Sequence, residues 1–200
     1  MIAIIDFGMG NLRSVQKAFE YVDHGAIITE NPEDSKQATH LVLPGDAAFG
    51  DAIRNLRKAG WDSAIHDFVA TGKPFLGICV GLQLMVAESE ELGQHTGLSL
   101  IPGSCVRFPT SERVPQIGWN QISMQRESPL LEEVEEGSFF YFVHSYYVRA
   151  DEVSDSVALT DYGIDYTSIA ARDNMYGVQF HPEKSQKVGL RLLANFASLN

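Results

Sequence analysis

The stretch that decides the fold is residues 73–88, KPFLGICVGLQLMVAE. Its apolar run at 74–78 predicts a buried parallel strand, and the apolar residues within 82–86 predict a helix after it. Between the two, residues 77–81 have the Gly-x-Cys-x-Gly spacing of a nucleophile elbow, in which glycines let the backbone turn sharply. Cys79 would lie at the tip, where helical N–H groups favour a thiolate. The alternative is a small, buried apolar Cys79.

Composition sets the limits of the function. With 200 residues, of which 44% are apolar, the chain can bury a core as one domain, residues 1–200. Its net charge of −11 argues against nucleic acid or an anionic membrane as a partner. Cys79 and Cys105 are too few for a disulfide framework, and no Cys/His cluster has zinc spacing. The chain shows no signal peptide and no bilayer-spanning run, so we expect a cytoplasmic protein. We also expect that it needs no metal or cofactor.

Strand and helix patterns alternate along the first half of the chain, which is typical of βαβ units and a parallel sheet. Active sites in such sheets gather at the carboxyl ends of the strands, so we expect Asp6, Pro44-Gly45 and Cys79 to be neighbours. After Gly93, short β-branched and aromatic runs predict mostly antiparallel strands. The expected fold is α/β, with a central, mostly parallel sheet flanked by helices and additional antiparallel strands in the C-terminal half. The elements expected in the first half are strands at 1–5, 26–29, 41–43 and 74–78, and helices after Asn11, at 49–59 and at 61–71; a last helix is expected at 185–199.

A thiol nucleophile needs a general base and a group that orients it. His181 follows a strongly apolar strand, and Pro182 forces it into an extended conformation. Glu183, two residues on, then points the same way and can accept an imidazole N–H. Cys79, His181 and Glu183 are therefore the predicted triad; the alternative is a turn with an incidental His and Glu. His144 is either a second site residue or a core histidine.

Two of these segments, GICVGLQ at 77–83 and His-Pro-Glu at 181–183, resemble class I glutamine amidotransferases, the Cys-His-Glu glutaminases. Longer stretches resemble one group of that family, the glutaminase subunits of imidazole glycerol phosphate synthases, and this resemblance covers essentially the whole chain. These stretches are IIDFGMGNL at 4–12, VPQIGWN at 114–120, YFVHSYY at 141–147 and GVQFHPEKS at 177–185.

The resemblance implies hydrolysis of glutamine to glutamate and ammonia. The ammonia would pass to a cyclase partner with a (β/α)₈ barrel, in a heterodimer that makes imidazole glycerol phosphate and an aminoimidazole carboxamide ribotide for histidine biosynthesis. Cys79 would attack the carboxamide, and His181 would protonate the ammonia and then activate water. The oxyanion donors would come from Val80 and from the loop at Asp46.

The resemblance also implies roles for residues that pattern alone leaves open. Without it, Trp119 would be core, Asn120 a turn, and the acidic residues at 88–91 a solvated helix end. The implied substrate pocket consists of Gly45, Gln83, Glu91, His144, Ser145 and Tyr146. The residues implied to face the cyclase and the ammonia route are Asn11, Trp119, Asn120, Tyr141 and Lys184.

The loop after the third strand departs from the family pattern. Residues 44–47 are Pro-Gly-Asp-Ala, where the family has Pro-Gly-Val-Gly. Ala47 makes a positive φ costlier, and Asp46 would oppose developing negative charge if it points inward; it could also face solvent or cap the helix near Phe49. Two hypotheses stay open: a glutaminase with a differently tuned loop, or a partner-docking subunit with weak or absent glutaminase chemistry. A glutaminase of another synthase and a Cys-dependent hydrolase of the stress-protein type are further alternatives.

Overall fold

Five parallel strands form the part of the sheet that carries Cys79. The computed structural model describes residues 1–200, and this part of its 12-stranded sheet has the order β2-β1-β3-β4-β14. Every pair in this series is parallel, which confirms the predicted βαβ arrangement. The strands are β1 (Ile2–Ile5), β2 (Ala26–Thr29), β3 (His40–Leu43), β4 (Phe75–Ile78) and β14 (Met175–Val178).

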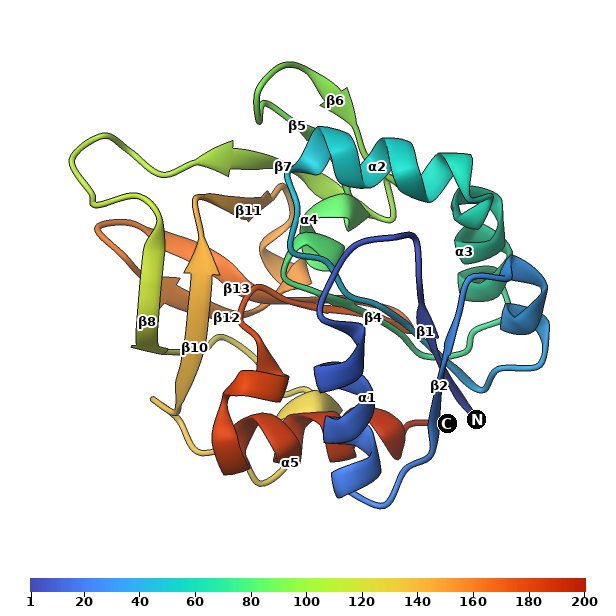
Figure 1. Ribbon diagram of the computed structural model, residues 1–200. Helices are drawn as coiled ribbons and strands as arrows, with labels where there is room; N and C mark the ends of the chain where they lie inside the picture. Colours follow the sequence, from blue (N-terminus) through green and yellow to red (C-terminus); the bar gives the residue numbers. More distant parts are fainter.

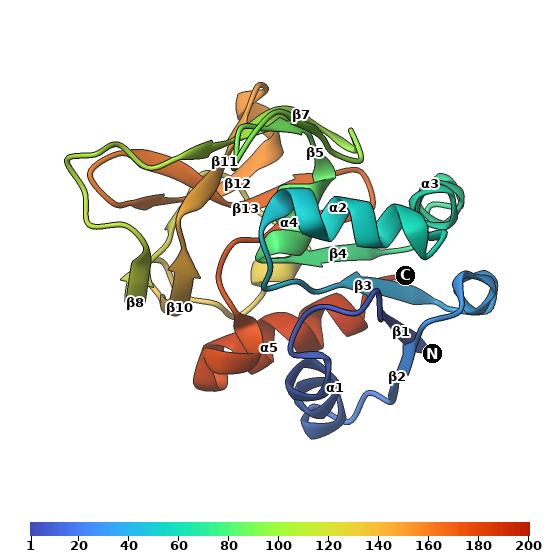
Figure 2. The same cartoon turned by 45° about the horizontal axis from the view of Figure 1, so that its top comes forward.

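Helices cover both faces of these strands. α1 and α5 lie side by side on one face, and α2, α3 and α4 lie on the other (Figures 1 and 2). Asn11 begins α1 as predicted, since its Oδ1 accepts the Ser14 N–H at 3.4 Å. The helices are α1 (Leu12–Tyr21), α2 (Phe49–Lys58), α3 (Trp61–Ala70), α4 (Val80–Met85) and α5 (Gln186–Ala197).

The second half of the chain extends the sheet and adds a separate ribbon. Beyond β14 the order continues β13-β11-β7-β5-β6, with antiparallel pairs except between β5 and β7. Off this path, β12 pairs with β13, and β9 pairs with β12. The ribbon is a two-stranded antiparallel sheet of β8 and β10, which stands apart from the main sheet (Figure 1). The strands are β5 (Val86–Ser89), β6 (His95–Thr96), β7 (Ile101–Arg107), β8 (Gln116–Gln121), β9 (Ser123–Met124), β10 (Phe139–His144), β11 (Tyr146–Ala150), β12 (Ser156–Asp161) and β13 (Asp165–Arg172). Four short 3₁₀ helices join them: η1 (Pro32–Lys36), η2 (Pro129–Leu131), η3 (Val153–Asp155) and η4 (Pro182–Lys184).

Two local predictions were wrong. The helix after Cys79 ends at Met85, and Val86, expected in that helix, begins β5 and pairs with Ile101. β-branched Val86 loses little in a strand, and the sheet pairing of 86–89 outweighs the helical pattern. The acidic residues from Glu88 onward therefore belong to a strand and a turn and do not form a helix end. β8 was not predicted as a strand.

The two chain ends meet at the amino edge of the parallel strands. The N-terminal ammonium of Met1 donates to Thr39 Oγ1 at 2.9 Å, just before β3. His40, the first residue of β3, places its Nε2 3.0 Å from the carbonyl oxygen of Leu199. Figure 1 marks the two termini together, beside β2. Cys79 follows the carboxyl end of β4, so it lies at the opposite edge of the sheet from the termini. No helix has the length and apolarity needed to span a bilayer.

Close packing of backbone on backbone holds α4 against β3 and β4. A Cβ added at Gly81 would overlap the carbonyl oxygen of Leu43, and one at Gly77 would lie 2.7 Å from the backbone of Gly81 and Leu82. The two glycines of the elbow motif are thus required by close approach rather than by their own φ angles.

Gly81→Ala should therefore destabilise the fold. We expect a loss of about 1–3 kcal/mol of unfolding free energy, measured by urea titration, because the sheet and α4 must separate to admit the methyl group. Gly25→Ala is the matched control: nothing lies within 4 Å of its added Cβ, and its unfolding free energy should stay within about 0.5 kcal/mol of the parent. Equal stability of the two variants would contradict this account of the elbow.

Candidate active site

Cys79 occupies a strained turn between β4 and α4. Its backbone angles are φ 54° and ψ −109°, in a region that residues other than glycine rarely adopt. Such a conformation costs on the order of 1–3 kcal/mol and persists only where the surroundings enforce it. Here the Cys79 N–H donates to the Val178 carbonyl at 2.8 Å, which extends the β4–β14 ladder by one residue before the turn. The predicted nucleophile elbow is present.

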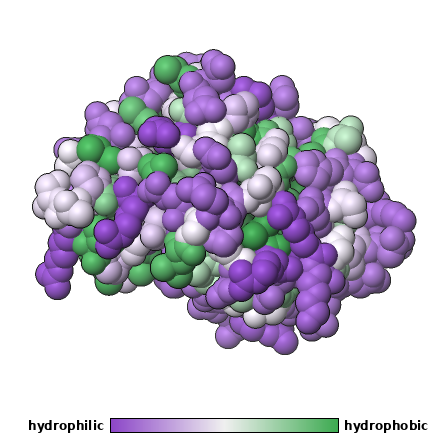
Figure 3. Space-filling view, turned by 90° about the horizontal axis from the view of Figure 1, so that it is seen from above, coloured by the Kyte–Doolittle hydropathy of each residue, from purple (hydrophilic) through white to green (hydrophobic).

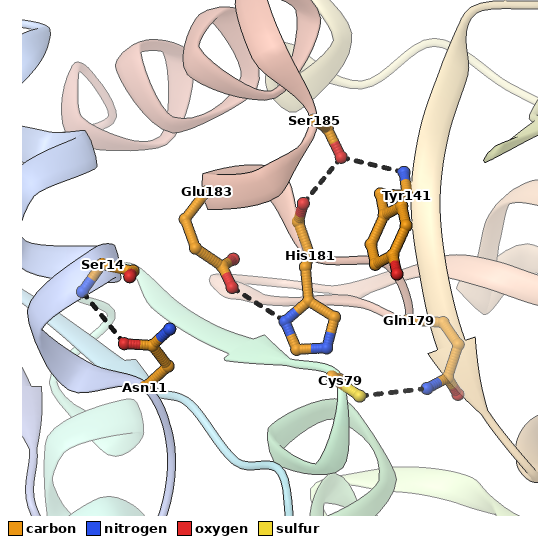
Figure 4. A network of polar contacts seen from close by, with 8 residues as sticks. All are labelled: Asn11, Ser14, Cys79, Tyr141, Gln179, His181, Glu183 and Ser185. Atoms are coloured by element: carbon orange, nitrogen blue, oxygen red, sulfur yellow. Dashed lines mark hydrogen bonds and ion pairs between the residues drawn. The ribbon is translucent and has the colours of Figure 1, made fainter. Parts of the chain in front are cut away.

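His181 lies between Cys79 and Glu183. Its Nδ1 is 2.8 Å from Glu183 Oε1, and the two side chains are only 7% and 1% exposed. Figure 4 shows the other ring nitrogen directed toward the Cys79 sulfur. The structure thus brings together the three residues predicted as a triad, in the order nucleophile, imidazole, carboxylate.

The electrostatics of this group favour a protonated imidazole. Burial lowers the pKa of His181, but hydrogen bonds to Cys79 and Glu183 outweigh it and raise the pKa to about 10. The resting site therefore holds an imidazolium beside the sulfur. The second oxygen of Glu183, Oε2, is buried without a hydrogen-bond partner, so the charge of this carboxylate is compensated chiefly by His181.

The backbone around His181 is fastened to the β8–β10 ribbon. The His181 N–H donates to the Tyr141 carbonyl at 2.9 Å. Ser185 Oγ donates to the His181 carbonyl at 2.6 Å and accepts the Tyr141 N–H at 3.0 Å (Figure 4). The ribbon therefore sets the position of the imidazole through three short hydrogen bonds.

A cavity of about 420 Å³ opens over this group, within the usual size range of small-molecule sites. Of the predicted substrate residues, five line it, and Gly45 does not: it is buried and a Cβ there would lie 2.9 Å from the Val80 Cβ. The lining residues are Asp46, Ala47, Ala48, Cys79, Val80, Gln83, Glu91, Val143, His144, Ser145, Tyr146, His181 and Lys184.

Asp46 lies exposed at the rim of this cavity. It does not cap α2, because the residue before the helix is Ala48 and no side chain caps it from that loop. Neither Asp46 nor Ala47 has a positive φ, so the strain expected from Ala47 is absent in this conformation.

The carboxyl ends of β1, β3 and β4 lie together, as predicted. β1 pairs with β3 with Ile4 opposite Val42, so Asp6 and Pro44-Gly45 follow neighbouring strand ends. Gly45 packs against Val80, the residue that follows Cys79. The Asp6 side chain lines a surface hollow with Asn11.

Glu91 is not the solvated carboxylate that charge pattern alone favours. Its Oε2 accepts the backbone N–H of Phe49 at 2.7 Å, so it stabilises the first turn of α2 from a distant part of the chain. His95 fixes the backbone of Glu91 itself, with its Nε2 3.0 Å from the Glu91 carbonyl. Glu91 thereby links the cavity wall to the helix that follows the 44–47 loop.

His144 is both buried and part of the cavity wall. Its Nδ1 is 2.8 Å from the Tyr146 carbonyl, and because a carbonyl only accepts, the proton lies on Nδ1. Burial lowers the pKa of His144 to about 4, and the hydrogen bond to Tyr146 only partly offsets it. A neutral imidazole of fixed tautomer therefore holds the Ser145-Tyr146 backbone in place.

The residues predicted to face a partner are distributed around the ribbon and the cavity. Trp119 is 45% exposed, which rules out the core alternative, and its ring meets that of Tyr141 edge-on at 6.0 Å. Asn120 lies within β8 rather than in a turn. Lys184 is exposed at the cavity wall, whereas Asn11 lines the separate hollow that contains Asp6.

Sequence reasoning missed Gln179, which is completely buried and has its Nε2 3.8 Å from Cys79 Sγ. One signal was available: in an extended chain Gln179 points the same way as His181, two residues on. Val143, which also lines the cavity, was predicted only as part of a strand.

Comparison with known proteins shows the family of the chain. The family described as Glutamine amidotransferase class-I matches residues 3–199. Two solved structures share the fold at 16% and 15% identity: a glutamine amidotransferase (TM-score 0.78, 99% of each chain covered) and PurLQS from Thermotoga maritima (TM-score 0.75, 98% of this chain and 96% of the other). The chain belongs to the class-I glutamine amidotransferase family.

Relatives with assigned names show which group within the family the chain is similar to. The "Imidazole glycerol phosphate synthase subunit HisH" of Syntrophotalea carbinolica is 50% identical over 100% of both chains. The protein of the same name from Geobacter sulfurreducens is 48% identical over 99% of this chain and 98% of the relative. Within its family, the chain groups with the HisH subunits of imidazole glycerol phosphate synthase.

Replacing Glu183 with Gln should lower the pKa of His181 from about 10 toward its ordinary value of 6.5, because the anion that holds the Nδ1 proton is lost. The folded-state pKa is raised, so the pair's stabilisation is complete below about pH 6.5 and is lost as the pH rises through about 10. The difference in unfolding free energy between the parent and Glu183→Gln should shrink over that window. NMR titration of the imidazole and urea unfolding give the two quantities.

Glu20→Gln, at an exposed position on α1, is the control and should leave the titration of His181 unchanged. If the pKa of His181 is the same in the parent and in Glu183→Gln, the carboxylate does not orient or charge the imidazole.

Proposed function

We propose that this chain hydrolyses L-glutamine to glutamate and ammonia with Cys79, His181 and Glu183, and that the ammonia passes to a cyclase subunit with a (β/α)₈ barrel. The observation that carries the proposal is the strained Cys79 at the floor of a cavity, with an imidazole and a buried carboxylate aligned behind it. Family membership and the names of the HisH relatives support the substrate and the synthase. The cyclase would use the ammonia to make imidazole glycerol phosphate.

The first half of the reaction follows from the charges of the resting site. The Cys79 sulfur attacks the carboxamide carbon, and the carbonyl oxygen becomes an oxyanion. The Val80 N–H lies in the first turn of α4, where backbone donors have no helical acceptor, and it suits that oxygen. His181, already an imidazolium, donates its proton to the leaving nitrogen, and ammonia departs from a thioester.

The second half regenerates the enzyme. Neutral His181 then accepts a proton from water, which attacks the thioester carbon and releases glutamate and the Cys79 thiolate. Glu183 keeps the same imidazole nitrogen protonated throughout, so the other nitrogen always faces the reacting atoms. Glu91 suits the substrate ammonium and the backbone at Ser145-Tyr146 suits its carboxylate, since both line the cavity.

An apolar face on the β8–β10 ribbon supports the partner. Alternate residues of the two strands share one face, on which Ile117, Trp119 and Phe139 are 63%, 45% and 52% exposed. The same face of β10 continues through Tyr141 to Val143 in the cavity wall. Seen from above, apolar surface is more frequent on the ribbon side than on the α3 side (Figure 3). A partner seated there would cover the mouth through which ammonia leaves.

Glutamate release should be slow for the isolated chain and rise roughly 10²-fold when the cyclase and a ligand in the cyclase site are added. One oxyanion donor is worth about that factor, and we expect the Asp46-Ala47 loop to supply one when the partner is bound. Cys79→Ala is the control and should release no glutamate in any state. No release by the parent in any state, with cyclisation still supported by added ammonium salt, would leave a docking subunit only.

Trp119→Ala should weaken binding of the cyclase by about 2 kcal/mol or more, roughly 30-fold in Kd, because central aromatic residues dominate such interfaces. Calorimetric titration of the purified subunits measures it. Tyr21→Ala is the matched control, since Tyr21 is an aromatic residue 77% exposed at the far end of α1, and its Kd should not change. Unaltered binding by Trp119→Ala would place the interface elsewhere.

A further inference from the structure

A buried amide faces the Cys79 sulfur from a position outside the triad. Gln179 follows β14, is completely buried, and has its Nε2 3.8 Å from Cys79 Sγ. Its backbone N–H donates to the Ser168 carbonyl at 2.9 Å, which fixes the main chain beside β13. Figure 4 shows the amide and the His181 imidazole on either side of the sulfur.

The orientation of this amide is fixed from its far end. The Tyr146 carbonyl only accepts hydrogen bonds, so the group of Gln83 that lies 2.9 Å from it must be the donor Nε2. The same Nε2 lies 3.3 Å from the other amide, which must present its acceptor, Gln179 Oε1. With Oε1 assigned in this way, the N–H group of Gln179 necessarily faces the sulfur. One backbone carbonyl thus dictates the polarity of two side-chain amides.

We propose that Gln179 is a positioning residue for Cys79: the relay from the Tyr146 carbonyl through Gln83 and Gln179 holds the sulfur by an N–H donor and couples it to the wall of the substrate cavity. The proposal deepens the proposed function and rests on it in taking Cys79 as the nucleophile. Gln179 touches the sulfur but has no contact with the cavity, which it does not line.

An amide suits this position because a buried sulfur anion needs hydrogen-bond donors around it. The sulfur is nearly buried, at 3% exposure for Cys79, so water satisfies little of its charge. His181 supplies one donor, but its proton moves in each turnover, first to the leaving nitrogen and then back from water. The Gln179 N–H carries no transferable proton, so it faces the sulfur at every stage of the reaction.

The same hydrogen bonds serve both the cavity wall at Tyr146 and the position of the Cys79 sulfur. Tyr146 belongs to the segment that lines the cavity, and its carbonyl is held by His144 as well as by Gln83. Loss of the Gln179 amide leaves the His144 contact intact. The cavity wall should therefore stay formed while the sulfur loses its donor, which predicts an effect on turnover rather than on substrate affinity.

The test is the pH dependence of Cys79 alkylation by iodoacetamide, in the parent and in Gln179→Met and Gln179→Glu, with the modified peptide identified by mass spectrometry. Cys105 serves as a silent internal reference, because it is completely buried and burial raises the pKa of its thiol. Gln179→Met keeps the length without a donor, and Gln179→Glu keeps the shape. Ser168→Ala is the matched control: it removes a buried hydroxyl from the neighbouring strand, whose hydrogen bond runs to the Ala158 carbonyl, away from the sulfur.

We expect both Gln179 variants to be alkylated about tenfold more slowly than the parent at neutral pH, with the alkylation profile moved about one unit upward, since a donor to a charged group is lost. In glutamine hydrolysis, kcat should fall about tenfold with KM within about twofold. Thermal melting shows which variants fold; if Gln179→Met does not, Gln179→Glu carries the test alone because its shape is unchanged.

Alkylation profiles of the Gln179 variants that coincide with the parent, or with a Ser168→Ala profile that is itself shifted, would overturn the proposal. Failure of the proposed function gives a different result: a parent without glutamine hydrolysis in any state would still show the shift in alkylation if Gln179 positions the sulfur.

Discussion

The backbone of Cys79 is the constraint on which the rest of the site depends. Its positive φ is unfavourable for any residue with a side chain, and it is held by contacts on both sides. The strand before it is closed by the hydrogen bond to Val178, and the helix after it presses Gly81 onto Leu43. The strain of this turn therefore lowers the stability of the fold. The turn places the sulfur at the start of a helix, at the floor of a cavity.

The parts of the site that were predictable are those in which chemistry and chain geometry coincide locally. Glycines two residues either side of Cys79 identify a sharp strand-to-helix turn, and the His181-Pro182-Glu183 run places an acid beside an imidazole through the period of an extended chain. The same reasoning gave the parallel core and the helices, because alternation of apolar runs and caps is visible within each segment. The match to a family added the substrate and the ribbon residues.

The parts that were not predictable depend on contacts between distant segments. Val86 fits the helical pattern of the residues before it, and only its pairing with Ile101 shows that it belongs to a strand. A strand this short has no local sequence pattern that reveals its pairing. The sequence pattern predicts a solvated Glu91, because nothing in it shows that Glu91 accepts a hydrogen bond from the Phe49 N–H, 42 residues away. Gln179 needed three segments, because only the Tyr146 carbonyl assigns its amide. Polar groups find their partners in three dimensions, and a local pattern does not carry that information.

The pairing of the chain ends has a consequence for any attachment to this molecule. Met1 and Leu199 are both fastened at the start of β3, at the edge of the sheet opposite Cys79. A tether from either end must pass along the length of a four-residue strand, about 13 Å, before it reaches the cavity edge. Labels or surfaces joined at either end therefore leave the cavity and the ribbon accessible. For a second protein tethered to this chain, the effective concentration at the cavity would be set by the length and stiffness of the tether, and hardly by the choice of end.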